Sequence, residues 1–161
     1  MNKQNVVKTD HLIIEPLSDS EMEHLIAKEL DTDMKQAYSE MLAGCKQNPE
    51  QRIWHAVWNM QINDVTGKSV GDLSFKGLDS NGIVEIGYGI KEEYEGQGYM
   101  TEAVTAMARW ASEQIGVKYV EAETDPDNKA SQRVLEKSGF ILNGKIGVEG
   151  PRYVWKKVYL N

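Results

Sequence analysis

Cysteine and histidine are scarce in this sequence of 161 residues, which holds one cysteine, Cys45, and three histidines. A single cysteine excludes an internal disulfide and fits a reducing, cytoplasmic setting. With so few thiol and imidazole groups we predict no metal site. The sequence also lacks repeats, linkers and low-complexity tracts, so we expect one domain that spans residues 1–161.

Long apolar runs and an excess of basic charge are missing as well. No apolar run approaches the roughly 20 residues that a membrane span requires, and residues 1–8 lack the apolar segment of a signal peptide. We therefore expect no membrane partner. A formal net charge of −7 disfavours nucleic acid as a partner, because binding to its phosphates needs a basic face. Such acidity suits a cationic substrate, and it equally serves solubility.

Apolar residues at helical spacing predict four helices. The first follows Ser18, which forms a capping box with Glu21. The others are expected at about residues 33–45, 99–115 and 128–137. The third of the four is apolar around much of its circumference, so we expect it to be largely buried.

Seven strands are expected around these helices. Their ranges are 12–14, 53–62, 70–75, 83–90, 118–124, 140–148 and 153–160. Two glycines, Gly87 and Gly89, lie inside the strand 83–90, and interior glycines mark a bulge or a close approach by another backbone or a ligand. The order of the elements predicts an α/β (α+β) domain on a mixed sheet.

The segment that carries chemical information begins at the loop before the third helix. Gly96 and Gly98 allow the backbone to turn tightly there and to approach a ligand. The first turn of the helix leaves N–H groups unpaired at the positive end of the helix dipole. A loop of this kind is suited to a phosphate or pyrophosphate group.

Two nucleotide-binding motifs fit this sequence poorly. Gly67-Lys68-Ser69 ends like a Walker A loop, but Ile62 stands where the first glycine of that loop must be. A dinucleotide-binding fingerprint would need glycine or alanine at Thr101, and the loop 91–95 is too long for it. A nicotinamide-dependent oxidoreductase is therefore a disfavoured rival.

A third candidate is the coenzyme loop of acetyltransferases. The segment 125–140, Asp-Pro-Asp-Asn-Lys-Ala-Ser-Gln-Arg-Val-Leu-Glu-Lys-Ser-Gly-Phe, strongly resembles the signature helix of the GNAT superfamily, in particular its RimJ/RimL-like branch. Three further segments are similar to the same branch, and the resemblance covers nearly the whole chain: Glu85-Ile86-Gly87-Tyr88, Gly96-Gln97-Gly98-Tyr99 and Thr101-Glu102-Ala103. Two positions depart from the family loop. Glu95 replaces a basic or amide residue, and Met100, bulkier than the family's small residue, would crowd the loop; both bear on coenzyme affinity.

The resemblance implies a mixed, mostly antiparallel sheet of about seven strands, splayed in the middle and flanked by about four helices. It also implies that acetyl-coenzyme A binds as co-substrate in the gap between the strands 83–90 and 118–124. The implied contacts are the backbone of Tyr88, Gly89 and Ile90 with the pantetheine and thioester, the N–H groups of Gly96, Gln97, Gly98, Tyr99, Met100 and Thr101 with the pyrophosphate, and Asn128 and Ser131 with the pantetheine and sulfur.

The implied reaction is direct attack of a primary amine on the thioester in a ternary complex, where the amine belongs to a protein N-terminus or a small molecule. A base must take the proton of the amine, and the leaving thiolate must receive one. Many family members place a tyrosine for the second task where this sequence has Leu135, so Ser131 is the predicted proton donor. For the base we name Glu85 first and Glu123 second.

Several readings stay open on the sequence alone. A non-catalytic acyl-coenzyme A-binding module is the alternative function, and a homodimer is possible because dimers are common in the family. His55 is expected in a strand that faces either the acceptor or the core. Trp54, Trp58 and Met60 are expected to share one strand face, as core or as a substrate cage. Tyr153 and Trp155 either line the acceptor mouth or pack internally.

Overall fold

The computed structural model describes residues 5–156, which form one eight-stranded sheet with the strand order β1-β2-β3-β4-β5-β6-β8-β7. Every neighbouring pair is antiparallel except β5 and β6, which are parallel. The mixed, mostly antiparallel sheet predicted above is therefore confirmed. The strands are β1 (Val7–Lys8), β2 (Leu12–Pro16), β3 (Val57–Ile62), β4 (Ser69–Leu78), β5 (Ile83–Ile90), β6 (Tyr119–Glu123), β7 (Phe140–Ile146) and β8 (Pro151–Trp155).

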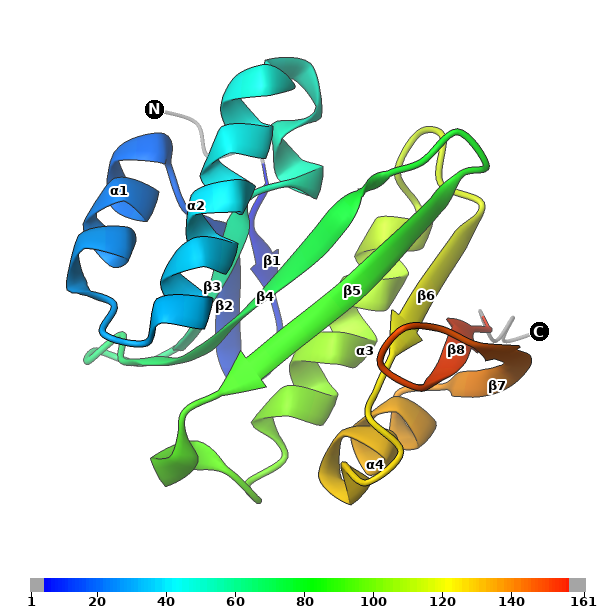
Figure 1. The fold of residues 1–161 in the computed structure, drawn as a ribbon. Coiled ribbons are helices and arrows are strands. Elements are labelled where there is room, and N and C mark those ends of the chain that lie inside the picture. Colours follow the sequence, from blue (N-terminus) through cyan, green and yellow to red (C-terminus); the bar gives the residue numbers. More distant parts are fainter. Residues whose placement is uncertain (1–4, 157–161) are drawn as a thin grey trace.

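Four α-helices flank this sheet in the described part of the chain. They are α1 (Asp19–Lys28), α2 (Thr32–Gln47), α3 (Tyr99–Ser112) and α4 (Lys129–Lys137), with short 3-10 helices η1 (Pro49–Trp54) and η2 (Glu92–Tyr94). The first two cover one face of the sheet, and α3 covers the other (Figure 1). The predicted capping box is present: the Ser18 hydroxyl accepts the N–H of Glu21 at 3.1 Å, and the Glu21 carboxylate accepts the N–H of Ser18 at 3.0 Å.

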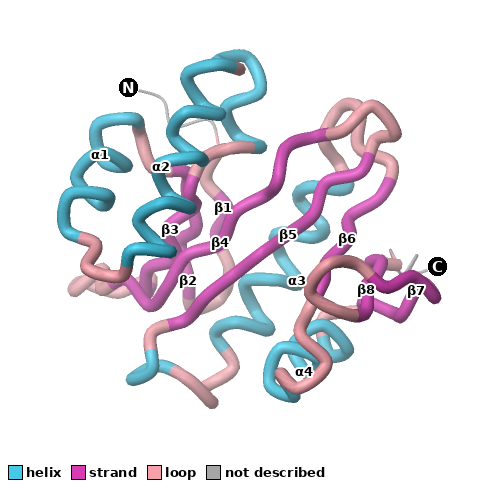
Figure 2. The backbone as a smooth tube through the Cα atoms, in the orientation of Figure 1, coloured by secondary structure: helices cyan, strands magenta, loops and turns pink. Residues whose placement is uncertain are grey.

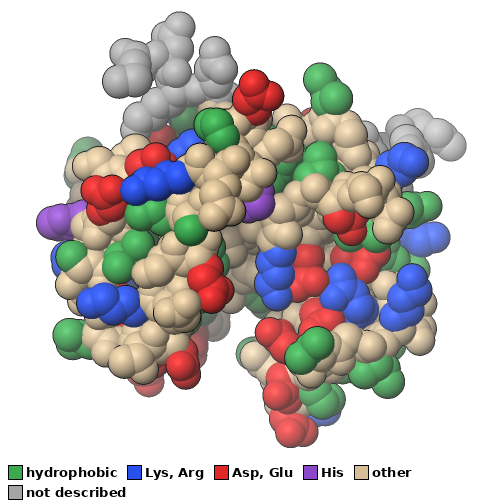
Figure 3. All heavy atoms as spheres, turned by 45° about the horizontal axis from the view of Figure 1, so that its top comes forward, with side chains coloured by type: hydrophobic (Ala, Val, Ile, Leu, Met, Phe, Trp, Pro, Cys, Tyr) green, Lys and Arg blue, Asp and Glu red, His purple; other side chains and the backbone are tan. Residues whose placement is uncertain are grey.

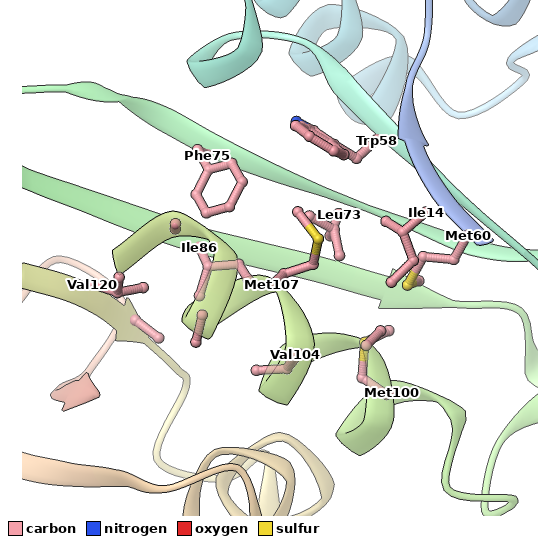
Figure 4. Packing of buried hydrophobic residues seen from close by; sticks show 14 of the residues in the cluster. Ile14, Trp58, Met60, Leu73, Phe75, Ile86, Met100, Val104, Met107 and Val120 are labelled. Atoms are coloured by element: carbon pink, nitrogen blue, oxygen red, sulfur yellow. The ribbon is translucent and has the colours of Figure 1, made fainter. Parts of the chain in front are cut away.

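The main core lies between the sheet and α3, and it explains why this helix is apolar. The buried residues of α3 recur at the three- and four-residue steps that place side chains on one face of a helix: Met100, Ala103, Val104, Met107, Ala108 and Ala111. Several of them point toward the strands in Figure 4. On the sheet side, Phe75 packs among Trp54, Trp58 and Trp110, with ring centroids 5.1–6.3 Å apart. Trp54, Trp58 and Met60 are therefore core residues.

Some predicted boundaries were wrong. The strand expected from residue 53 begins at Val57, because Pro49 opens a 3-10 helix that continues to Trp54. As a result, Trp54 and His55 lie outside the strand. The long helix ends at Ser112 rather than at residue 115. The last strand begins at Pro151, and the predicted residues 157–160 lie outside the described part of the chain.

A partly buried cation ties the strands beside the splayed region together. The Arg152 guanidinium donates to Glu85 at 2.9 Å, to Glu121 at 3.0 Å and to Glu123 at 2.7 Å. These four side chains are between 7% and 20% exposed, and Lys76 adds a second cation on Glu85. One arginine of β8 thus neutralises carboxylates of both β5 and β6, which would otherwise repel each other at the centre of the sheet.

Replacing Arg152 with glutamine should lower the free energy of unfolding at pH 7 by at most about 3–5 kcal/mol, the loss when one partner of a fully buried ion pair is removed. Urea unfolding followed by circular dichroism measures the loss. Arg133→Gln, which removes one exposed cation from α4, is the matched control; its effect should stay within about 0.5 kcal/mol.

The pH dependence of this loss has a definite sign. The N–H of Glu149 and the guanidinium of Arg152 lower the pKa of Glu123. Its stabilising contribution is therefore present above the unfolded pKa of about 4.3 and disappears as the pH falls through the lower folded value. The difference between Arg152→Gln and the wild type should shrink below about pH 4. A difference that grows in acid would contradict this account.

Candidate functional site

The two parallel strands at the centre of the sheet separate after a short stretch of pairing. Residues Ile83–Glu85 of β5 pair with Tyr119–Glu121 of β6, and β5 then continues to Ile90 with β4 as its remaining partner. Figure 2 shows the two strands diverging, with α3 behind them. One backbone edge of β5 after Glu85 therefore has no neighbouring strand in the described part of the chain.

A cavity of about 430 Å³ opens on this part of β5. Gly87 and Gly89 of β5 have no side chains to fill this cavity, and the space above them is open: a Cβ at either position would meet nothing within 4 Å. Residues of α2 form the facing wall, and Asn128 and Ser131 of the α4 end complete the lining. A hollow is visible in Figure 3 between two raised parts of the surface, and acidic and basic side chains alternate beside it. The site offers open backbone next to hydroxyl groups.

The loop before α3 has the shape expected for a phosphate cradle. Gly96 and Gly98 have φ angles of 75° and 85°, a region that favours glycine, and a Cβ at either would meet nothing within 4 Å. No side chain caps the N-terminus of α3, which leaves its first N–H groups available. The residues present thus fit a pyrophosphate group, and the binding of one here stays a prediction.

The two departures from the family loop lie in different surroundings. Glu95 is exposed to solvent. Met100 is 7% exposed and belongs to the core beneath the loop (Figure 4), so its bulk is accommodated by the sheet. The nearby carboxylate of Glu102 accepts hydrogen bonds from Thr9 and from the backbone and ring of His11. Its charge is therefore satisfied by the segment before β2.

Tyr88 and Ser131 meet across the splayed region. The Tyr88 hydroxyl lies 2.9 Å from the Ser131 hydroxyl and also donates to the Ser131 carbonyl at 3.3 Å. Burial raises the pKa of Tyr88, which keeps the phenol protonated. The side chain of Asn128 accepts the N–H of Ser131 at 3.0 Å and so caps α4. The sequence predicts Ser131 as a proton donor, but it predicts a role only for the backbone of Tyr88.

The predicted bases Glu85 and Glu123 both line the cavity, and both are held in ion pairs with Arg152. Glu123 also accepts the N–H of Glu149 at 2.7 Å, and its pKa is lowered. A carboxylate stabilised in this way binds a proton weakly. Their role as bases stays a prediction.

Sequence reasoning missed another carboxylate of the same cavity, Asp72 in β4. The hydroxyl of Tyr38 in α2 donates to it at 2.7 Å. Burial raises the pKa of Asp72, and burial together with the neighbouring carboxylate raises the pKa of Tyr38. Asp72, Ser74 and Lys76 alternate along β4 as its polar face, so the sequence held no signal that set Asp72 apart.

The weaker candidates take structural positions. Cys45 is buried between α1 and α2, and burial raises the pKa of its thiol, so it is no ready nucleophile. The ring of His55 packs close to Gly44 and Gly77. Tyr153 is 4% exposed in the core, and the Trp155 ring nitrogen donates to the Ser138 carbonyl at 3.0 Å. Internal packing accounts for all four.

Between residues 5 and 156, no helix combines the length and the apolar character needed to cross a bilayer. The same stretch holds no group of three or more His, Cys, Asp or Glu side chains placed to bind a metal ion.

Known proteins share both the sequence pattern and the fold. YjdG, an N-acetyltransferase from Bacillus subtilis, is 40% identical over 77 residues, which cover 47% of this chain and 46% of YjdG. The ribosomal-protein-serine acetyltransferase of Escherichia coli is 30% identical over 76 residues, which cover 47% of this chain and 42% of that protein. These alignments span less than half of the relatives' own length.

The similarity in structure extends further along the chain. A crystal structure of an acetyltransferase from Agrobacterium tumefaciens covers 98% of this chain, which covers 97% of that structure, with a TM-score of 0.72 and 20% identity. RimL, described as a ribosomal L7/L12 alpha-N-protein acetyltransferase and solved in complex with coenzyme A, covers 93% of this chain, which covers 97% of it, with a TM-score of 0.69 and 17% identity. At such identities the likeness concerns the fold.

The model of one family, the acetyltransferase (GNAT) domain, matches residues 6–141 and so includes the splayed strands, the glycine loop and α4. The E. coli relative agrees with the resemblance to the RimJ/RimL-like branch. This chain belongs to the GNAT acetyltransferase domain family.

Proposed function

We propose that this enzyme transfers an acetyl group from acetyl-coenzyme A to a primary amine in a ternary complex. One observation carries the proposal: the partnerless edge of β5 borders an open cavity that also holds the hydroxyls of Tyr88 and Ser131. The other proposed features are a cytoplasmic location, a homodimer, and no nucleic acid or membrane partner.

The chain offers a binding group for each part of the coenzyme. Acetyl-coenzyme A supplies an acyl group activated as a thioester. The backbone of Tyr88, Gly89 and Ile90 would pair with the pantetheine and hold the thioester carbonyl through an N–H. The N–H groups at Gly96–Thr101 would bind the pyrophosphate. Asn128 and Ser131 border the same cavity from α4.

The leaving sulfur needs a proton, and the Tyr88–Ser131 pair is placed to give it. Leu135 stands where many family members have a tyrosine, and its side chain is buried in the core. The phenol of Tyr88 reaches α4 from β5 instead. Because burial keeps this phenol protonated, it can restore the proton that the Ser131 hydroxyl gives away.

The charge of the cavity supports a cationic acceptor. One lysine, Lys76, lines it together with five carboxylates: Asp72, Glu85, Glu123, Asp125 and Glu149. Glu85 and Glu123 remain proposed bases, with their ion pairs to Arg152 weighing against them. Since one relative acts on ribosomal-protein serine, a short peptide with an N-terminal serine is a suitable first acceptor, next to small amines.

The first test is the thermal unfolding midpoint with and without acetyl-coenzyme A. Ligand at about a hundred times its dissociation constant adds about 2.7 kcal/mol to the stability, or about 5–10 °C in Tm for a domain of this size. NAD at equal concentration is the control and should leave Tm unchanged. No shift at millimolar acetyl-coenzyme A would contradict the proposal, whereas a shift without turnover on any amine would favour the non-catalytic module.

A second test concerns the proton donor. Ser131→Ala and Tyr88→Phe should each lower kcat, and the double variant should lower it by about 10²–10⁴-fold, the usual contribution of general acid–base catalysis. The KM for acetyl-coenzyme A should change little. Tyr119→Phe, which alters an exposed tyrosine of β6, is the matched control. An unchanged kcat in the double variant would remove both hydroxyls from this role.

A further inference from the structure

Asp72 lies where two cavities meet. A larger cavity of about 800 Å³, lined by α1, α2 and the sheet, adjoins the 430 Å³ cavity that opens on the splayed strands. The two share the lining residues Met34, Tyr38, Val57, Asp72 and Gly89. Asp72 carries the one carboxylate in this shared set. Asp72 therefore borders both the larger cavity and the cavity that holds Tyr88 and Ser131.

The position of Asp72 in the sheet directs its carboxylate to this boundary. Asp72 is the register partner of Gly89 in β5, and residues opposite each other in antiparallel strands place their side chains on the same face. Gly89 has no side chain, so the carboxylate stands beside the bare backbone expected to hold the thioester. The carboxylate lies on β4, the neighbour of β5 on the side away from β6.

Hydrogen bonding leaves one oxygen of Asp72 available. The Tyr38 hydroxyl occupies Oδ2 at 2.7 Å, and no hydrogen bond to Oδ1 is found among residues 5–156. Within the same residues, every fully buried side-chain nitrogen or oxygen has a hydrogen-bond partner. Oδ1 is therefore reached from the cavity, and Tyr38 fixes the carboxylate in an orientation that presents it.

We propose that Asp72 binds the acceptor amine and takes its proton, with Tyr38 as a positioning residue and the larger cavity holding the rest of the acceptor. This assignment rests on the proposed acetyltransferase function. It identifies the acceptor as a primary amine carried on a body that fills the cavity between α1, α2 and the sheet.

The electrostatic surroundings of Asp72 suit a base better than those of Glu85 or Glu123. Burial and the negative charge of Glu29 raise the pKa of Asp72, while the Tyr38 hydrogen bond and Lys91 oppose the rise. A base is most effective when its pKa approaches the working pH. Glu123 has a lowered pKa and an arginine partner, and Glu85 is bonded to both Arg152 and Lys76.

The proton balance of the proposed step is complete. One N–H bond of the ammonium breaks as an O–H bond forms on Asp72, and the nitrogen lone pair then bonds to the acyl carbon while the carbon–sulfur bond breaks. The Tyr88–Ser131 pair protonates the sulfur. The nitrogen loses its second proton, which restores that pair through solvent, and Asp72 releases its proton to solvent.

The test compares two acceptors that differ in whether they need a base. A peptide with an N-terminal serine has an α-amine with a pKa of about 7.7–8.0, whereas an arylamine is already neutral at pH 7. Asp72→Asn should lower kcat/KM for the peptide at pH 7 by about 10²-fold or more and should lower it much less for the arylamine. Tyr38→Phe should show a smaller loss of the same pattern.

The controls separate this role from others. Asp33→Asn, at an exposed site in α2, should leave both activities unchanged. Every variant should keep the rise in Tm that acetyl-coenzyme A causes. If the wild type itself shows no such rise, the proposed coenzyme site has failed, and this outcome is distinct from a failure of Asp72. Glu85→Gln tests the competing base.

A structural role would give different results. Equal losses for both acceptors in Asp72→Asn would overturn the assignment. It would also be overturned by a peptide-specific loss in Glu85→Gln with full activity in Asp72→Asn, or by a wild type that binds acetyl-coenzyme A and acetylates neither probe.

Stability gives an independent readout. A carboxylate whose folded pKa is raised destabilises the fold as the pH rises from its unfolded pKa through its folded one, and the cost persists above. Asparagine keeps an oxygen that accepts from Tyr38 and carries no charge. Asp72→Asn should therefore raise Tm at pH 7 while it lowers activity. A lower Tm would show that the carboxylate serves the fold and would overturn the assignment.

Discussion

The separation of β5 from β6 is the constraint on which the site depends. Three residues of each strand pair in parallel, and the strands then part, so that β5 from Ile86 to Ile90 keeps one edge for other use. Backbone N–H and C=O groups deprived of a strand partner require another one or solvent. An extended amide-bearing ligand such as pantetheine can supply it. The fold therefore lacks hydrogen bonds between β5 and β6 after Glu85, and these backbone groups are available to a ligand.

A sheet interrupted at its centre has to be held together elsewhere. Near the point where β5 and β6 separate, Arg152 of β8 bonds to a carboxylate of each strand, Glu85 of β5 and Glu123 of β6. On the other side of the sheet, α3 packs its apolar face against β4 and β5 through the core. The ionic cluster and the core thus hold β5 and β6 in place and leave the opening between the two strands unfilled.

How far the sequence predicts this arrangement follows from the range of the interactions. Strand β5 matches its predicted bounds, and the α1 capping box forms as expected, because alternation and capping depend on neighbouring residues. The predicted start of the strand at residue 53 was wrong because Pro49 opens a 3-10 helix that occupies the residues before Val57. The Arg152 cluster was beyond prediction, since it requires β8 to lie between β6 and β7. The Tyr38–Asp72 pair likewise requires the packing of α2 on the sheet.

The carboxylates of the site divide into two kinds by their partners. Those that face Arg152 are paired with a partly buried cation, which also lowers the pKa of Glu123. Asp72 has a neutral phenol as its direct partner, with Lys91 acting only through its charge. A partly buried carboxylate without a directly bonded cation is costly for folding, and such a cost is expected where chemistry requires the group. The same physical quantity, the stability of the ionised form, therefore separates the structural carboxylates of this sheet from the one suited to accept a proton.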